Sequence, residues 1–341
     1  MRVIPSKLSS GSVFTLLAAL LFLAQSGEAE AQSRSFQMAL YVDFSEPRLT
    51  PPNPETRSPD TDILMFGEGQ EQPPKPYRSI MKYKSWPTGP TLSAYGYDWS
   101  RIIAVVIDEP YAYFMTNDER NNHSNPCGAQ DSRLGKLAQT ALLLPPAADA
   151  LKSIAPWTRL WVIFRPDEVS WMMQGQCSQT HLNQSYIDVI SFDDYYKNFS
   201  ELRTPYEWFA TYPATPQQQM ALVPGTFYKD GKDNPTQQSQ YLQGYFAYAE
   251  EKNHSCNRPL GPRGVTGSYD GCLVWMVLGW LSNKFTDTGN GTTYVGELEP
   301  GAEEIARVWR QEVALPVRGG LSYELTRQQI VSTLLRQWLS D

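Results

Sequence analysis

Eight short apolar runs recur along the chain from residue 38 onward, and each is followed by a polar or helical stretch. The runs are nearly continuous in apolar character and show little of the alternation expected for a sheet with one solvated face. Such runs are typical of strands buried on both faces, as in parallel sheets covered by helices. The runs are Met38–Phe44, Asp62–Glu68, the weaker Arg78–Tyr83, Ile102–Glu109, Arg159–Arg165, Tyr186–Asp194, Met220–Thr226 and Cys272–Trp280.

Helical patterns occupy several of the segments that follow these runs. They carry apolar residues on one side, and the last begins with a capping box of threonine and glutamine. The predicted helices are Leu134–Ile154, interrupted at Pro145 and Pro146, Gln237–Lys252, Glu299–Trp309 and a last helix that begins at Thr326.

Strands that alternate with helices predict an α/β fold, and eight such units predict a (β/α)8 TIM barrel. The alternative is an open doubly wound sheet, which has a glycine-rich turn after its first strand. Here Asp43–Pro47 follows the first run, and no G-x-G-x-x-G sequence occurs. We therefore expect a closed barrel, with long loops at its C-terminal face formed by residues 46–61 and 111–133.

The N-terminal segment has the pattern of a cleavable secretory signal. Basic residues precede the apolar run Val13–Ala24, and the small-x-small sequence Ala29–Ala31 follows it. The run is too short for a membrane span, which needs about 20 residues. We expect a signal peptide over 1–31, one barrel domain with its C-terminal helices over 32–341, and a secreted or periplasmic protein with no membrane attachment after cleavage.

The composition narrows the class of partner. A net charge of −7 does not suit nucleic acid binding, which needs a basic surface, whereas 10 tryptophans and 19 tyrosines favour a carbohydrate. No motif indicates a cofactor, and we expect no metal site. The alternative is a site for Mg²⁺ or Ca²⁺, whose ligands would be the carboxylates of Asp43, Glu68, Asp108 and Asp193. The sequence does not indicate an oligomeric state.

Four cysteines in an exported chain predict two disulfide bonds. Three pairings are possible, and we favour Cys127 with Cys177 and Cys256 with Cys272. None of the spacings resembles a zinc site.

The residues that end the strands are the candidates for a functional site, because the active sites of barrels lie at that face. Acidic groups dominate these positions and aromatic residues are interleaved with them. Sugar rings stack on aromatic faces, and paired carboxyls cleave glycosidic bonds. The candidate carboxyls are Glu109, Asp193 and Asp194, and the candidate substrate-binding residues are Asp43, Glu68, Asp108, Tyr111, Arg165, Tyr195, Tyr228 and Trp280.

The sequence Asp108-Glu109-Pro110 resembles the end of strand four in clan A glycoside hydrolases and related barrels. Val189–Tyr195 is similar to the end of their strand six, and Gly271–Trp275 to their strand eight. The resemblance covers about a tenth of the residues. It implies a glycoside hydrolase-like barrel with Glu109 as general acid/base.

The chain departs from this family at strand seven. Clan A enzymes have a nucleophilic glutamate there, whereas Pro224–Tyr228 contains no carboxylate. Asp193 or Asp194 is then the second carboxylate, or an acetamido group of the substrate attacks with Asp194 and Tyr195 orienting it, or the site binds sugar without cleaving it.

Structural interpretations of the same residues stay open. Asp108 and Glu109 are candidates for an ion pair with Arg165, and Asp193 and Asp194 point to opposite sides of a strand, so one of them is structural. We therefore predict an exported glycoside hydrolase-like barrel acting on a polysaccharide or oligosaccharide. The alternative is a catalytically inactive carbohydrate-binding barrel.

Overall fold

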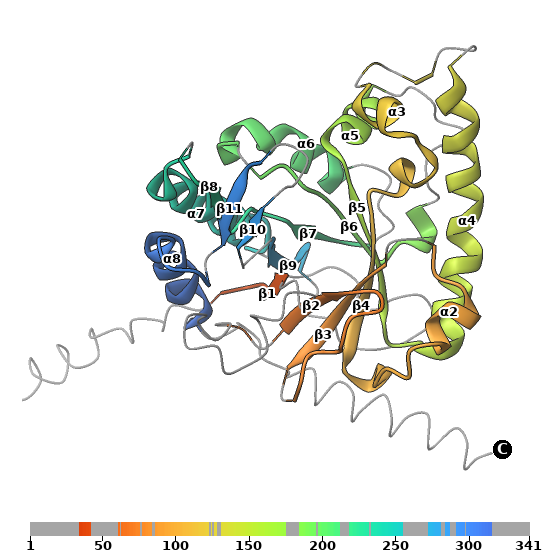
Figure 1. Ribbon diagram of the computed structural model, residues 1–341, viewed down its shortest axis with the longest axis horizontal. Coiled ribbons are helices and arrows are strands. Elements are labelled where there is room, and N and C mark those ends of the chain that lie inside the picture. Colours follow the sequence, from red (N-terminus) through yellow and green to blue (C-terminus); the bar gives the residue numbers. More distant parts are fainter. Residues whose placement is uncertain are drawn as a thin grey trace, which may run out of the picture. The chain divides into compact units, whose positions relative to one another are not determined.

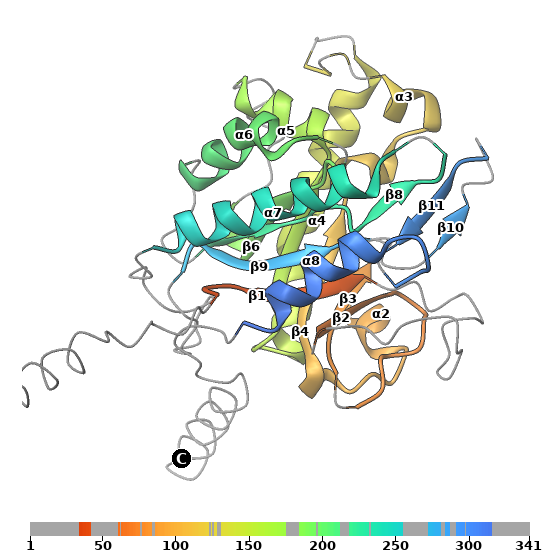
Figure 2. The same ribbon diagram turned by 90° about the vertical axis from the view of Figure 1, so that its left-hand side faces the viewer.

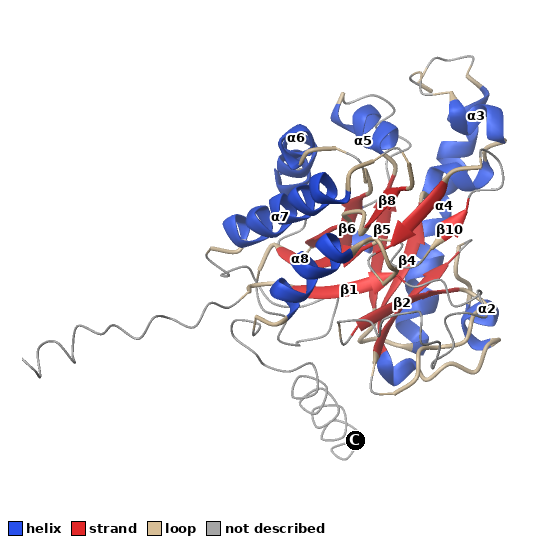
Figure 3. Cartoon of the chain, turned by 60° about the vertical axis from the view of Figure 1, so that its left-hand side comes forward, coloured by secondary structure: helices blue, strands red, loops and turns tan. Residues whose placement is uncertain are grey.

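The computed structural model shows a closed barrel of eight parallel strands, in the order β1-β2-β3-β4-β5-β6-β7-β9 (Figures 1 and 3). It describes residues 34–41, 61, 63–75, 77–83, 86–122, 124, 126–127, 131–174, 184–195, 197–211, 218–231, 233–254, 272–280, 284–286, 291–296 and 298–315. These residues do not include the expected signal peptide, Asp43, Cys177, Cys256, the helix from Thr326, or the expected loop over 46–61 apart from its last residue. The domain division and the disulfide pairing therefore stay predictions, although no described cysteine is free.

Each of the eight apolar runs forms a barrel strand, so the predicted (β/α)8 fold is confirmed. The barrel closes through parallel pairing of the first and last strands, with Leu40 opposite Gly279. The strands are β1 Gln37–Tyr41, β2 Ile63–Gly67, β3 Arg78–Tyr83, β4 Ile102–Asp108, β5 Arg159–Phe164, β6 Val189–Phe192, β7 Gln219–Leu222 and β9 Val274–Gly279.

Within the described ranges, helices follow six of the strands and lie outside the barrel. Figure 2 shows α7 and α8 side by side over β9 and β1. None of the helices in the described ranges has the length and apolarity of a membrane span. The helices are α2 Gly89–Ser93, α3 Asn117–Asn121, α4 Ser132–Ile154, α5 Pro166–Met173, α6 Phe199–Thr211, α7 Pro235–Lys252 and α8 Glu303–Val313, with short 3-10 turns at η2 Trp99–Arg101, η3 Pro110–Phe114 and η5 Gln184–Tyr186.

Two expectations for the segment after β4 need correction. Helix α4 continues through Pro145 and Pro146 without interruption. Its residues Leu144, Ala147 and Leu151 are buried on one side, and this packing outweighs the hydrogen bonds that the prolines remove. The expected loop over 111–133 is partly helical, since it contains α3 and most of η3.

A small antiparallel sheet at the C-terminal end of the barrel was not predicted. It has the order β10-β11-β8, with β8 at Phe227–Lys229, β10 at Phe285–Thr286 and β11 at Thr293–Gly296. Strands of two to four residues carry no readable periodicity, which explains why the sequence patterns did not indicate them. The sheet lies beyond the ends of β7 and β9 (Figure 1).

Apolar side chains fill two separate layers. One layer fills the barrel interior, and the other lies between the strands and the helices. The interior includes Trp161, whose ring meets that of Trp275 edge to face at a centroid distance of 6.0 Å. The barrel is thus a packed core and not a pore, so access to chemical groups is limited to its ends.

Gly279 provides a test of this packing. A Cβ at this position would lie 2.6 Å from Cγ2 of Thr226 and 2.7 Å from Cδ2 of Leu40. We expect Gly279→Ala to lower the free energy of unfolding by about 1–3 kcal/mol, measured by urea denaturation. The matched control is Gly135→Ala in α4, where no atom lies within 4 Å of the added carbon. It should instead raise stability by about 0.5–1 kcal/mol, and equal effects of the two substitutions would contradict the packing.

Candidate active site

Lys82 and Asp108 face each other inside the barrel at the carboxyl ends of β3 and β4, a region called the mouth below. Ile80 and Val106 belong to the interior core, and residues two positions further along a strand face the same side. Nζ of Lys82 lies 2.6 Å from Oδ2 of Asp108, and the side chains are 20% and 15% exposed. The mouth therefore contains a largely buried ion pair.

Aromatic rings surround the Lys82 ammonium group. Its Nζ lies 4.4 Å from the ring centroid of Trp280 and 5.4 Å from that of Tyr41, and the two rings are 4.8 Å apart. Burial by itself lowers the pKa of Lys82, but Asp108, Tyr41 and Asp193 outweigh this effect, so the pKa lies above its ordinary value. Lys82 therefore remains a cation.

Asp193, directly after β6, interacts with Lys82 and Asp108 at the mouth. The Tyr195 hydroxyl donates a hydrogen bond to its Oδ2. Burial raises the pKa of Asp193 well above its ordinary value, Asp108 and Glu109 raise it further, and the opposing effects of Tyr195 and Lys82 are smaller. Asp193 therefore holds a proton at pH values at which an ordinary aspartate is ionised.

Glu109 follows β4 in the left-handed region of backbone conformation, with φ of 45°. Its N–H donates to the carbonyl of Ile163 in β5 at 2.8 Å, and its Oε2 lies 2.7 Å from Nη2 of Arg120. Burial and the Asp108 carboxylate raise the pKa of Glu109, against the lowering effect of Arg165 and Arg120. A raised carboxyl pKa is what a general acid requires.

The expected ion pair of Arg165 with Asp108 or Glu109 does not form, because Arg165 has other partners. Nε of Arg165 lies 3.2 Å from Oδ1 of Asp167, and Nη2 donates to the backbone carbonyl of Arg120 at 3.0 Å. Arg165 therefore holds the α3 segment, and Arg120 on that segment forms the ion pair with Glu109.

Asp194, directly after Asp193, has its own set of partners. Its Oδ2 lies 2.7 Å from Nζ of Lys197, and its backbone carbonyl accepts the Tyr245 hydroxyl of α7 at 3.2 Å. Neither Glu109 nor Asp108 contributes to these contacts, whereas both raise the pKa of Asp193. Of the two adjacent aspartates, Asp193 is thus the one that shares the mouth with Glu109.

Two of the predicted substrate-binding tyrosines lie apart from these carboxyls. Tyr111 is 3% exposed and packs against Phe164 between the barrel and the helices. Tyr228 lies on β8, where burial raises its pKa and Asp230 and Glu303 raise it further. Tyr111 therefore belongs to the outer core layer and Tyr228 to the small sheet.

The other predicted binding residues divide into three cases. Trp280 and Tyr195 stack at the mouth, with a centroid distance of 6.0 Å. Glu68 follows β2 next to Lys82, to whose carbonyl its N–H donates at 2.8 Å. Asp43 lies outside the described residues. Within the described ranges, no group of three or more His, Cys, Asp or Glu side chains is arranged to hold a metal ion.

Gly225, after β7, leaves little room for a side chain. A Cβ on Gly225 would lie 3.0 Å from Cβ of Tyr195 and 3.2 Å from a ring carbon of Phe227. Nε2 of Gln238 also donates to the Gly225 carbonyl at 2.8 Å. The structure therefore provides no counterpart of the strand-seven glutamate of clan A enzymes.

Sequence analysis missed three residues of the mouth: Lys82, Tyr41 and Arg120. Period-two counting from Ile80 would have placed Lys82 inward, but its run was the weakest of the eight. The run Met38–Phe44 included Tyr41 without assigning it a role. No pattern indicated Arg120, since its position depends on the fold of the segment after β4.

The burial of Glu168, a neighbour of Glu109, can be tested through the pH dependence of stability. Glu168 is 2% exposed on α5, and its Oε2 accepts the Arg165 N–H at 2.8 Å. Burial raises the pKa of Glu168 well above its ordinary value. The folded state therefore holds this proton more tightly than the unfolded state. The contribution of Glu168 to stability falls as the pH rises past its pKa in the unfolded state. We expect Glu168→Gln to match wild type in urea denaturation below pH 4 and to exceed it increasingly at higher pH. A constant difference across pH would contradict this.

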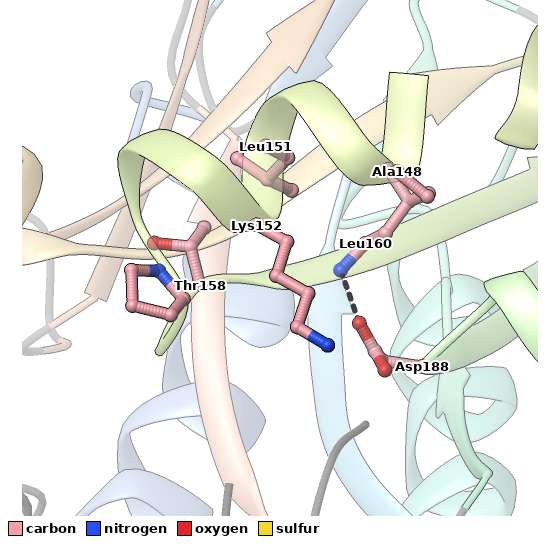
Figure 4. A pocket seen from close by; sticks show the side chains of 7 residues that line it. Ala148, Leu151, Lys152, Thr158, Leu160 and Asp188 are labelled. Carbon is pink, nitrogen blue, oxygen red and sulfur yellow. Dashed lines mark hydrogen bonds between the residues drawn. The ribbon is translucent and has the colours of Figure 1, made fainter. Parts of the chain in front are cut away.

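A small pocket lies at the opposite end of the barrel strands from the mouth. Figure 4 shows its side chains, with Lys152 from α4 and Asp188, which precedes β6. Asp188 uses its Oδ2 to accept the N–H of Leu160 at 2.8 Å. Because active sites of barrels lie at the C-terminal face, we assign this pocket no catalytic role.

No family model matches the chain, and no curated protein sequence matches it. Solved structures with a similar fold include a modular endo-β-1,4-mannanase from Cellulomonas fimi, with a TM-score of 0.45, 12% identity and coverage of 83% of this chain and 71% of that one. A β-glucosidase from Thermotoga maritima has a TM-score of 0.41, 10% identity and coverage of 74% and 83%.

A mutant of Bacteroides uniformis β-glucuronidase 2 matches with a TM-score of 0.43 and 10% identity, over 68% of this chain. The chain spans only 28% of the length of that enzyme. These neighbours are glycoside hydrolases, the class of enzyme that the strand ends resemble. At TM-scores below 0.5 the likeness supports no inference about activity or family.

Proposed function

We propose that the chain is an exported glycoside hydrolase-like barrel that acts on a polysaccharide or an oligosaccharide, with Glu109 as general acid/base and Asp193 as the second carboxylate. Export is proposed from the signal pattern of residues 1–31. The observation that carries the proposal is the position of both carboxyls at the mouth, where Glu109 raises the pKa of Asp193.

Two carboxyls with raised pKa values together hold a proton under conditions in which ordinary carboxyls are ionised. Cleavage of a glycosidic bond needs a proton on the leaving oxygen and a carboxylate to assist attack at the sugar carbon. The Glu109 side chain is 28% exposed and is accessible to a leaving oxygen. Asp193 lies deeper, beside the stacked Tyr195 and Trp280, and is proposed to act on the sugar ring.

The crowded end of β7 supports a mechanism without a strand-seven nucleophile. Asp193 then releases its proton to solvent and serves as base or nucleophile, while Glu109 supplies the proton for the leaving oxygen, or an acetamido group of the substrate attacks while Tyr195 orients it. A separation of the two carboxyls of about 5 Å corresponds to retention of configuration, and about 6.5–9.5 Å corresponds to inversion.

One observation favours a second function, a barrel that binds carbohydrate without cleaving it. Nη2 of Arg120 lies 2.7 Å from Oε2 of Glu109, and this pairing opposes the rise in the pKa of Glu109 that burial and Asp108 cause. A substrate that strengthened this ion pair would leave Glu109 without a proton to transfer.

A glycan panel distinguishes the two functions. Purified protein is incubated with polysaccharides and oligosaccharides of known linkage, and released sugar and binding are both measured. We expect release from at least one glycan and none from heat-denatured protein. Binding without release from any glycan would support the binding barrel, and absence of both would contradict the proposal.

A further inference from the structure

We propose that Lys82 is a positioning residue of the mouth, which keeps Asp108 as a fixed carboxylate so that Asp193 meets the substrate as a carboxylic acid. In the proposed function Asp193 acts only after it has released this proton, and the inference rests on that function only for this later use of the residue. The protonation pattern itself belongs to the protein without substrate. Nothing in the strand-end patterns gave Lys82 a role, because its run is the weakest in the sequence.

The geometry of the ion pair supports this role. Lys82 reaches Asp108 across the interior face of two adjacent strands at 2.6 Å, and the rings of Trp280 and Tyr41 hold the ammonium group in place. Oδ1 of Asp108 is buried and accepts no hydrogen bond from the residues that the structure describes. A carboxylate with one unsatisfied buried oxygen depends on its single cation to remain charged.

The charged and titratable groups that interact with Asp193 lie on several strands and helices. They are Lys82 from β3, Asp108 and Glu109 at the end of β4, Tyr195 after β6, and Tyr206 and Tyr245 from α6 and α7, with Tyr41 from β1 acting on Lys82. In the described part of the chain, Lys82 is thus the cation that faces both inward aspartates. Lys82 contacts Asp108, which leaves Asp193 with a tyrosine hydroxyl as its direct partner.

The arrangement assigns one proton to the two aspartates. A buried carboxyl that lacks a cation takes up a proton, particularly when a second carboxylate lies nearby. The position of Lys82 therefore decides that Asp108 is the ion and Asp193 the acid. Removing either member of the ion pair should move the proton.

The test labels the full-length protein with ¹³C at Cγ of aspartate, so that glutamates do not contribute, and follows each carboxyl by NMR as a function of pH. Asp193→Asn and Asp108→Asn assign the two signals. In wild type we expect Asp108 to be ionised and Asp193 protonated near neutral pH. An ionised Asp193 in wild type would overturn the inference.

Three variants separate a positioning role from a structural one. In Lys82→Met the Asp108 signal should shift to its protonated position, and in Lys82→Arg it should remain as in wild type. In Asp108→Asn, Asp193 should ionise to pair with Lys82. An unchanged Asp108 signal in Lys82→Met would overturn the inference. A protonated Asp193 in Asp108→Asn would also overturn it, and this second variant provides the test if Lys82→Met does not fold.

Activity supplies a second readout once a cleaved glycan is known. Lys82→Met should lower kcat about 100-fold and shift the pH profile of kcat, and Lys82→Arg should restore both in large part. A loss of activity with an unchanged pH profile would contradict the inference. The expected NMR titration in a protein that cleaves no glycan would retain the inference about Lys82 and reject the hydrolase.

Discussion

Replacement of Glu109 by glutamine is expected to lower kcat for glycan hydrolysis by about 10²–10⁴-fold, with little change in KM. Glutamine keeps the size of the side chain and its ability to accept from Arg120, but it has no proton to donate. The loss should be smallest for substrates with good leaving groups, since such groups depart without protonation.

Glu304→Gln is the matched control for this prediction. Oε1 of Glu304 on α8 lies 2.6 Å from Nη2 of Arg307 at the surface. Glu304→Gln therefore makes the same chemical change as Glu109→Gln, but away from the mouth. It should leave kcat and KM unchanged. If Glu109→Gln releases as much product as wild type, the assignment of the acid is wrong.

The largest effect on stability is expected at Trp161, in the centre of the barrel. Its side chain is fully buried, and its Nε1 donates to Oγ of Ser191 at 2.7 Å. Trp161→Ala should lower the free energy of unfolding by about 3–5 kcal/mol, measured by urea denaturation, because the interior cannot collapse to fill the space.

Leu142→Ala is the control, because Leu142 is a large apolar residue that is 75% exposed on α4. It should change stability by no more than about 0.5 kcal/mol. Similar losses from the two substitutions would mean that Trp161 does not fill a packed interior.

The barrel strands were predictable because burial on both faces leaves a direct trace in the sequence. A run such as Ile102–Glu109 is apolar at nearly every position, and the structure places it between the interior and the outer layer. The small sheet of β8, β10 and β11 was not predictable, since its pairing depends on segments that the barrel brings together.

The mouth was predictable only in part, for a related reason. Strand ends converge in a barrel, so Glu109, Asp108 and Asp193 could be grouped from the sequence. The partner of each carboxyl could not be read in this way. Lys82 faces inward only because its strand register turns it there, and Arg120 reaches Glu109 from a segment that Arg165 holds in position.

These partners change the chemistry that is expected. Without Lys82 and Arg120, the mouth would contain several carboxyls of similar character. With them, Asp108 pairs with one cation and Glu109 with another, whereas the direct partner of Asp193 is a tyrosine hydroxyl, and burial raises the pKa of Asp193 well above its ordinary value. The fold, and not the local sequence, therefore gives Asp108, Glu109 and Asp193 different partners and different chemical roles.

The central claim is that Glu109 and Asp193 act as one unit at the mouth. The direct measurement is the rate of product release from a cleaved glycan by wild type, Glu109→Gln, Asp193→Asn and the double variant. Residues that act together are not additive, so we predict that the double variant loses little more than the more damaging single variant. Losses that multiply, or an Asp193→Asn variant as fast as wild type, would contradict the account.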